Sequence, residues 1–173
     1  ADLSYIEEAA KGGLTAESIP TAYLTAVIVV HKDNTTIRSL EDITKSGVRI
    51  SLADQSAAVG KFTRKVLAEN GLLNAVEINV TVTKPTVNGI VEDVSIGSVD
   101  ATIAWDAVAR NFTDLRTIEI PIFSAKRRSA AVAVLNSTRK STAALHLARY
   151  ISAKDKGGEV FKRNGFDTPE KAD

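Results

Sequence analysis

The sequence predicts an α/β fold, because two kinds of hydrophobic periodicity alternate along its 173 residues. Segments in which every second residue is apolar are typical of strands, and they alternate with segments whose apolar residues recur every three to four positions, as in helices. The run Tyr23–His31 has an unbroken apolar centre, which indicates a strand covered on both faces. Strands joined by single helices favour right-handed crossovers and a mostly parallel sheet.

The first expected elements are short. Ser4-x-x-Glu7 has the pattern of a capping box and opens a helix that Gly12-Gly13 ends. The strand 23–31 begins the core. After a turn, we expect Ser39 to cap a second short helix, which stops at Gly47.

The rest of the chain repeats strands, loops and helices. Alternation predicts the strands, and residues such as Asn-Gly end the helices. The remaining elements, in chain order, are a strand over 48–52, a helix through Val59, Phe62 and Val66 that ends at Asn70-Gly71, a strand over 76–82, a helix from Val87 to Gly97, strands at 101–105, 118–122 and 130–135, and a helical region over about 141–161.

Ligands of such sheets bind at the carboxyl ends of the strands, where the next helix begins. This rule selects three places in the sequence, 54–60, 84–89 and 105–107. We therefore expect these three segments to lie together at one edge of the sheet.

Composition narrows the classes of function. The chain has 44% apolar and 25% charged residues and a net charge of +1, which excludes disorder and coiled coil and disfavours nucleic acid as a partner. Absence of Cys excludes disulfides, thiolate metal sites and Cys nucleophiles. The longest apolar run, 26–30, is too short to span a membrane, and no signal segment opens the chain. We expect a form that is either cytosolic or already processed.

No catalytic constellation is apparent. The two histidines, His31 and His146, lie far apart in the sequence, and neither a nucleotide-binding glycine motif nor a G-x-S-x-G elbow occurs. No carboxylate pair has a spacing that indicates a metal site. We expect a binding protein rather than an enzyme, with no cofactor and no metal.

Two helix starts are candidates for anion binding. The small residues 56–60 leave the first-turn N–H groups of their helix uncovered, and 86–89 repeat the arrangement, with Thr86 as the expected N-cap. The alternative for the first start is a plain connection whose small residues serve close packing. Two uncovered starts at one sheet edge are more informative than one.

The sequence leaves open two roles for Trp105 and two for a basic cluster. Trp105 ends a strand at the expected ligand edge, where it is either a core residue or an indole donor pointing into a cleft. Lys126-Arg127-Arg128 is either a solvated turn or a cluster that attracts anions.

With these residues in view, the chain resembles the periplasmic molybdate/tungstate-binding proteins of ABC transporters, which have the type 2 periplasmic-binding-protein fold. The resemblance covers nearly the whole chain and depends on the order and spacing of several short motifs. These motifs are 1–5 with 11–14, 40–43 with 48–54, Ala58-Val59-Gly60, Val87-Asn88-Gly89, 97–105 and Gly158-x-x-Phe161-x-x-Asn164-Gly165-Phe166.

The resemblance implies two lobes, each with three αβα layers. Residues 1–34 and 123–173 would form the outer lobe and 35–122 the inner lobe. Members of the family begin with a strand, helix, strand portion that carries two Ser ligands, and this chain starts after it. We therefore expect an incomplete first lobe that binds weakly or not at all alone, unless another copy of the chain completes an edge.

The resemblance also implies a function. A substrate-binding component of an ABC transporter would capture a tetrahedral oxyanion, molybdate or tungstate, between its lobes in the periplasm and deliver it to a membrane permease. Backbone amides at Val59 and Val87 match the family's ligand positions, with neighbours Ala58, Gly60 and Thr86, while Trp105 stands where the family has a Tyr hydroxyl. The alternatives are an effector-binding domain of a transcription regulator and a binder of another small anion.

Overall fold

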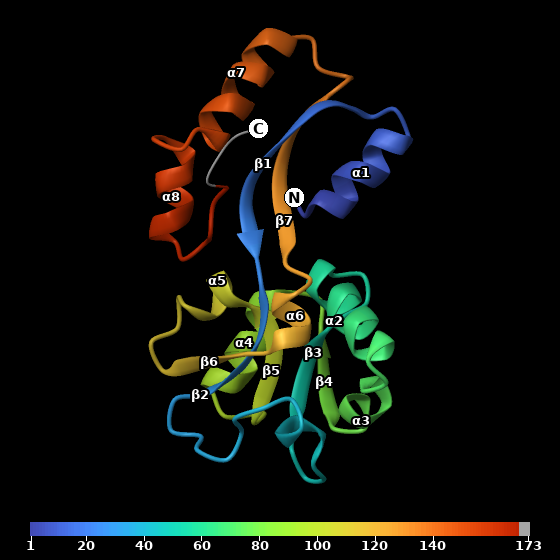
Figure 1. The fold of residues 1–173 in the computed structure, drawn as a ribbon, viewed down its shortest axis with the longest axis vertical. Helices are drawn as coiled ribbons and strands as arrows, with labels where there is room; N and C mark the ends of the chain where they lie inside the picture. The colour runs from blue at the N-terminus through green and yellow to red at the C-terminus, as the bar shows by residue number, and fades with distance from the viewer. Residues whose placement is uncertain (170–173) are drawn as a thin grey trace. The chain divides into compact units, whose positions relative to one another are not determined.

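The computed structural model describes residues 1–169, and the chain forms two compact units (Figure 1). The first contains 1–24 and the chain from Arg128 onward, and the second contains 25–127. The two compact units thus divide at residues 24 and 127, whereas the lobe boundaries expected from the sequence lie after residues 34 and 122. The difference arises because the strand β2 (Ala26–His31) and the short helix α6 (Pro121–Ser124) both belong to the second unit.

The second unit contains a five-stranded sheet in the order β4-β3-β5-β2-β6. Besides β2, its strands are β3 (Ile50–Ala53), β4 (Val80–Lys84), β5 (Ala101–Trp105) and β6 (Leu115–Glu119). β3 is parallel to β4 and β5, whereas β2 is antiparallel to both of its neighbours. Four strands thus run in one direction and β2 runs antiparallel to them. A loop rather than a covering helix joins β2 to β3.

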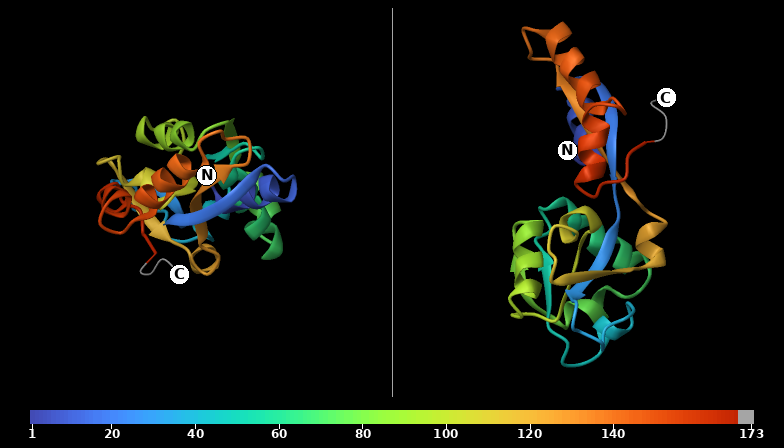
Figure 2. Two further views of the ribbon diagram at one scale, coloured as in Figure 1. Left: turned by 90° about the horizontal axis from the view of Figure 1, so that it is seen from above. Right: turned by 90° about the vertical axis from the view of Figure 1, so that its left-hand side faces the viewer.

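Helices cover both faces of this sheet. α4 (Val87–Ser95) packs across β2, β3, β4 and β5 on one face, while α2 (Ala58–Glu69) packs on β3 and β5 and contacts α6 on the other (Figure 2). The short helix α5 (Asp106–Ala109) follows β5 and contacts α4. The central strands β2, β3 and β5 are buried nearly throughout, which explains their continuous apolar runs. The three-layer αβα arrangement is confirmed for this unit.

Three expected strands differ in the structure. The strand expected over 118–122 lies earlier in the chain, as β6, because Pro121 begins α6. The run 23–31 is divided at Thr25, because its first residues end β1 (Thr15–Leu24) in the first unit. The alternating stretch 76–82 is divided as well, into the helix α3 (Leu73–Glu77) and β4. Val76 is fully buried and lies three residues after Leu73, so the same residues also satisfy helical spacing.

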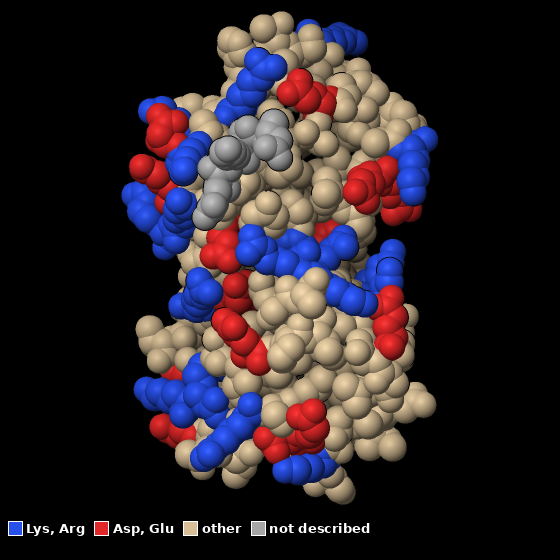
Figure 3. Space-filling model, viewed as in Figure 1, with Lys and Arg blue, Asp and Glu red and all other residues tan. Residues whose placement is uncertain are grey.

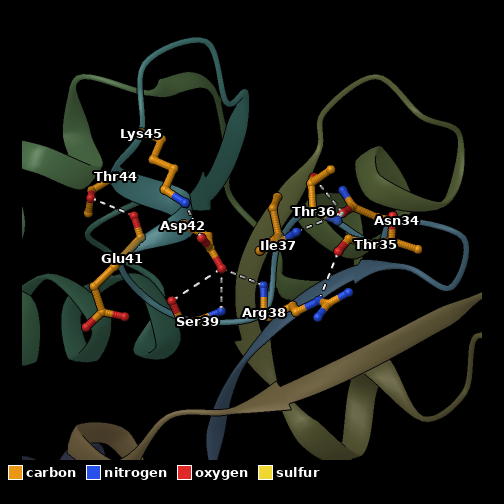
Figure 4. A network of polar contacts seen from close by, with 10 residues as sticks. All are labelled: Asn34, Thr35, Thr36, Ile37, Arg38, Ser39, Glu41, Asp42, Thr44 and Lys45. Atoms are coloured by element: carbon orange, nitrogen blue, oxygen red, sulfur yellow. Dashed lines mark hydrogen bonds and ion pairs between the residues drawn. The ribbon is translucent and has the colours of Figure 1, made fainter.

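Side chains rather than regular structure organise the loop between β2 and β3. The 3-10 helix η1 (Asp42–Thr44) is its one element, and Ser39 does not cap a longer helix as expected. Asp42 instead accepts hydrogen bonds from the backbone N–H groups of Arg38 and Ser39 and pairs with Lys45, with O···N distances of 2.8, 3.0 and 2.6 Å (Figure 4). Asn34 Oδ1 accepts from three groups in the same way: Thr36 N, Thr36 Oγ1 and Ile37 N.

The first unit is built on a two-stranded antiparallel sheet of β1 and β7 (Arg128–Leu135). Three helices pack on it: α1 (Leu3–Lys11), α7 (Ser141–Ser152) and α8 (Gly157–Arg163). The last two replace the single helical region expected over 141–161, because the chain is extended at Ala153. Asp2, not Ser4, is the N-cap of α1, and its carboxylate also pairs with Arg128 at 2.6 Å.

Within residues 1–169, no helix combines the length and the apolar character that crossing a lipid bilayer requires.

The start of α2 lies unusually close to the end of β3. A Cβ atom added at Gly60 would lie 2.1 Å from the carbonyl oxygen of Asp54 and 2.5 Å from that of Ala53. Backbone oxygens at the end of a strand cannot move aside as a flexible side chain would, so only glycine fits. Arg64 stabilises the same contact, because its guanidinium donates to Ala53 O at 2.6 Å and to Glu77 Oε1 at 2.7 Å.

Gly60→Ala should therefore lower the free energy of unfolding by about 3 kcal/mol, the cost of overpacking against immobile backbone. Urea or thermal unfolding measures the change. Gly12→Ala is the matched control, since the nearest atom to its added Cβ lies at 3.5 Å, an ordinary contact. Equal stability of the two variants would show that the close approach at Gly60 is absent.

The Asp42 carboxyl should titrate far below its ordinary range, because the Lys45 ammonium and the Arg38 backbone N–H lower its pKa to about 2. The stability that this depressed pKa contributes is fully present above the ordinary Asp value of about 3.9 and is lost as the pH falls toward 2. NMR titration of the carboxyl carbon gives the midpoint. Lys45→Met should raise it and Lys45→Arg should not; an unchanged midpoint in Lys45→Met would contradict the assignment.

Candidate functional site

Three segments that the sequence selects lie at one edge of the second unit's sheet. β3, β4 and β5 run parallel, so their carboxyl ends meet at this edge, and α2, α4 and α5 begin directly after them (Figure 1). Ala58, Val59 and Gly60 form the first turn of α2, Thr86 and Val87 begin α4, and Trp105 is the last residue of β5. The structure thus places all six candidate residues at the ends of adjacent or neighbouring strands.

The first turn of α2 has no side-chain cap. Its N-cap residue is Ala57, which is extended (φ −79°, ψ 142°) and whose N–H donates to Asp54 O at 3.0 Å. The next three N–H groups, of Ala58, Val59 and Gly60, precede the first intrahelical donor, Lys61. No acceptor for these three groups is found within the described chain. They form a cluster of donors at the positive end of the helix dipole.

Asp54 carries the carboxylate closest in sequence to the start of α2, and it forms hydrogen bonds within its own loop. Its Oδ1 accepts hydrogen bonds from Ser56 N at 2.8 Å and from Ser56 Oγ at 2.7 Å. The pKa of Asp54 lies below its ordinary value, first because the backbone N–H of Ser56 donates to the carboxylate and second because the Ser56 hydroxyl also donates to it. The carboxylate therefore turns toward Ser56 rather than capping α2.

α4 begins with a cap that leaves other donors available. Thr86 is extended (φ −124°, ψ 148°), and its Oγ1 accepts from Gly89 N at 3.2 Å, which confirms the expected N-cap. The N–H groups of Val87 and Asn88, in the same turn, have no acceptor among residues 1–169. Because the hydroxyl oxygen of Thr86 is engaged as an acceptor, its proton remains for donation outward.

Trp105 belongs to an aromatic cluster. Its ring lies 5.5 Å from that of Phe62 in α2, and Phe62 lies 6.1 Å from Phe123 in α6. Only 6% of Trp105 is exposed. No hydrogen bond of its indole N–H is found within the described chain. The core role is therefore observed, and the role of the indole as a donor into a cleft stays a prediction.

Lys84 and Asp93 position α4 and were not singled out by the sequence. The Lys84 side chain passes beside Gly89, and its ammonium donates to Asp93 Oδ1 at 2.9 Å. Asp93 is 4% exposed, and its second oxygen has no partner among residues 1–169. The pair ties the end of β4 to the middle of α4. The sequence did hold a signal for this pair. Lys84 ends a strand, and nine residues later Asp93 lies on the apolar face of the next helix.

Two residues of the basic cluster 126–128 form ion pairs. Lys126 pairs with Glu69, and Arg128 pairs with Asp2 in the first unit. Positive and negative side chains intermingle over the face shown in Figure 3, in keeping with the net charge of +1. Among residues 1–169, no three His, Asp or Glu side chains are grouped so that they could hold a metal ion. Donor N–H groups, rather than a charged side-chain cluster, are the chemical feature of this edge.

Comparison with known structures shows the same fold. The chain resembles the periplasmic molybdate-binding protein of Azotobacter vinelandii with a TM-score of 0.75 and 16% identity, covering 98% of this chain and 77% of that one. It resembles the sulfate-binding protein SubI of Mycobacterium tuberculosis H37Rv with a TM-score of 0.79 and 15% identity, covering 96% and 66%. These neighbours support the two-lobed periplasmic-binding-protein fold.

Sequence comparison gives more specific relatives. The molybdate-binding protein ModA of Mycobacterium tuberculosis H37Rv is 28% identical over 174 residues. The alignment covers 98% of this chain, but the chain spans only 64% of the length of that relative. The family described as bacterial extracellular solute-binding protein matches residues 1–167, nearly the whole chain. The chain belongs to this family of bacterial extracellular solute-binding proteins.

Proposed function

We propose that the chain is the substrate-binding component of an ABC transporter, in the periplasm, and that it captures a tetrahedral oxyanion, molybdate or tungstate. One observation carries the proposal: two helices, α2 and α4, begin at one sheet edge with first-turn N–H groups for which residues 1–169 offer no acceptor. Family membership and the molybdate-binding relatives support it. A membrane permease would receive the anion.

The chemistry of these donors suits an oxyanion. Each N–H group forms a charge-assisted hydrogen bond with an oxygen, and the positive ends of both helix dipoles add a favourable field. Neutral groups suffice, so neither a metal nor a cofactor is required, and no catalytic residue is needed for binding. We assign the contacts to the N–H groups of Ala58, Val59, Gly60 and Val87, to the Thr86 hydroxyl and to the Trp105 indole.

Selectivity would follow from the scarcity of acceptors in this set. An indole and the backbone N–H groups only donate, and the Thr86 oxygen already uses one of its two lone pairs on Gly89 N. A protonated anion such as hydrogen phosphate would bring a proton for which these groups offer only the remaining lone pair of Thr86. Molybdate, tungstate and sulfate carry no proton at neutral pH. They would therefore bind more tightly than phosphate, and the size of the site would discriminate among them.

Binding should appear as stabilisation. At a ligand concentration 100-fold above the dissociation constant, the free energy of unfolding should rise by about 2.7 kcal/mol. Thermal unfolding with molybdate, tungstate, sulfate or phosphate at equal ionic strength measures this, with chloride as the control. Absence of stabilisation by all four oxyanions would contradict the proposal, and stabilisation by phosphate alone would contradict the expected selectivity.

Proline substitutions test individual donors. Ala58→Pro and Val87→Pro each remove one N–H at the first helical position, where proline is well tolerated because no intrahelical bond is lost. The preceding residues, Ala57 and Thr86, are already extended, as a residue before proline prefers. Each substitution should weaken molybdate binding roughly 10- to 100-fold, the value of a hydrogen bond to a charged group.

Isothermal titration gives the affinities, and thermal unfolding without ligand checks that the variants fold. Ala58→Ser is the matched control, because it changes the side chain at the same position and keeps the N–H. An Ala58→Pro variant that folds and binds as tightly as Ala58→Ser would remove Ala58 from the site.

A further inference from the structure

Lys84 connects the two groups of donors at the candidate site. Its carbonyl oxygen accepts a hydrogen bond from Asp54 N at 2.7 Å, in the loop that leads into α2. Its side chain runs along the start of α4, since a Cβ added at Gly89 would lie 3.4 Å from Lys84 Cδ and 3.6 Å from Lys84 Cβ. The ammonium then reaches Asp93, in the second turn of α4. One residue at the end of β4 thus contacts both the loop before α2 and the helix α4.

Asp93 brings a negative charge close to the donors of α4. It follows Gly89 by four residues, so both lie on one face of the helix, and helical side chains lean toward the N-terminus. The carboxylate therefore points toward the first turn, less than about 9 Å along the helix axis from Val87. Asp93 is buried, and water and salt screen a buried charge only weakly. An anion at the start of α4 would be repelled by this carboxylate unless a cation cancelled its charge.

Lys84 supplies this cation. Its ammonium donates to Asp93 Oδ1 at 2.9 Å, while Asp93 Oδ2 has no partner among residues 1–169. The Lys84 side chain is 41% exposed, so it reaches the buried carboxylate from the surface. A second buried carboxylate at this edge is arranged similarly, because Asp106, directly after β5, lies 3.5 Å from the guanidinium of Arg110. Both of these buried acids are thus paired with a cation.

We propose that Lys84 is a positioning residue of the anion site, which cancels the charge of Asp93 and so permits a dianion to bind at the start of α4. This inference rests on the proposed function, because it concerns the affinity for molybdate. Lys84 acts through Asp93 and does not touch the anion. The two other roles that the contacts allow are a direct contact between Lys84 and the anion, and an ion pair that serves the fold alone.

A cycle of charge variants separates these roles. Lys84→Met leaves the Asp93 carboxylate without its cation and should weaken molybdate binding roughly tenfold. Asp93→Asn leaves the Lys84 ammonium uncancelled and should tighten binding about threefold, a smaller effect because the ammonium is partly exposed and better screened. The double variant Lys84→Met/Asp93→Asn carries neither charge and should bind within about twofold of the parent chain.

Isothermal titration with molybdate gives the affinities, and two further variants are controls. Lys84→Arg keeps the cation and should bind about as tightly as the parent chain. Lys45→Met removes the cation that pairs with Asp42, in the loop before β3 and therefore at the opposite edge of the sheet, and should leave the affinity unchanged. Thermal unfolding without ligand reports whether each variant folds. Should Lys84→Met fail to fold, because an unpaired buried charge is costly, Asp93→Asn and the double variant still decide.

A double variant roughly tenfold weaker than the parent chain would overturn the inference in favour of direct contact between Lys84 and the anion. Asp93→Asn that binds no more tightly than the parent chain would overturn it in favour of a pair that serves the fold alone. Both outcomes leave the proposed function standing. A parent chain that binds no oxyanion would instead contradict the proposed function, and this inference with it.

Discussion

The contact between the first turn of α2 and the end of β3 fixes the candidate site. Gly60 lets the helix backbone approach the carbonyl oxygens of Ala53 and Asp54 more closely than any residue with a Cβ would allow. Arg64 then binds Ala53 O from one turn farther along. Because this contact fixes the helix on the end of the strand, the N–H groups of Ala58, Val59 and Gly60 keep one position relative to the sheet edge.

α4 is held by polar contacts instead. The buried Ser51 hydroxyl donates to Ile90 O at 3.0 Å, and the Lys84–Asp93 pair links the end of β4 to the second turn of the helix. The cap at Thr86 fixes its first turn. Two donor groups are thus positioned by different means, steric in α2 and hydrogen-bonded in α4. An anion that met both would find its donors already ordered, which reduces the entropic cost of binding.

Local pattern predicted the parts of this site that depend on local structure. The helix starts, the Thr86 cap and the shared sheet edge followed from periodicity and capping residues. The close packing of Gly60 against β3 could not be predicted in this way, because small residues at a helix start are compatible with either packing or anion binding. The neighbours of Trp105 were likewise hidden, since Phe62 and Phe123 come from distant positions. β1 was missed because Glu17, Ser18 and Pro20 interrupt its alternation.

The two units differ in how completely they bury their strands, and this difference bears on where binding can reside. The second unit covers both faces of β2, β3 and β5, so its sheet edge and helix starts have a full core beneath them. The first unit has two strands, of which β1 buries only two of its ten residues. Regions with few buried contacts open at lower free energy than complete cores. The proposed donors therefore belong to the part of the chain best able to hold them in place.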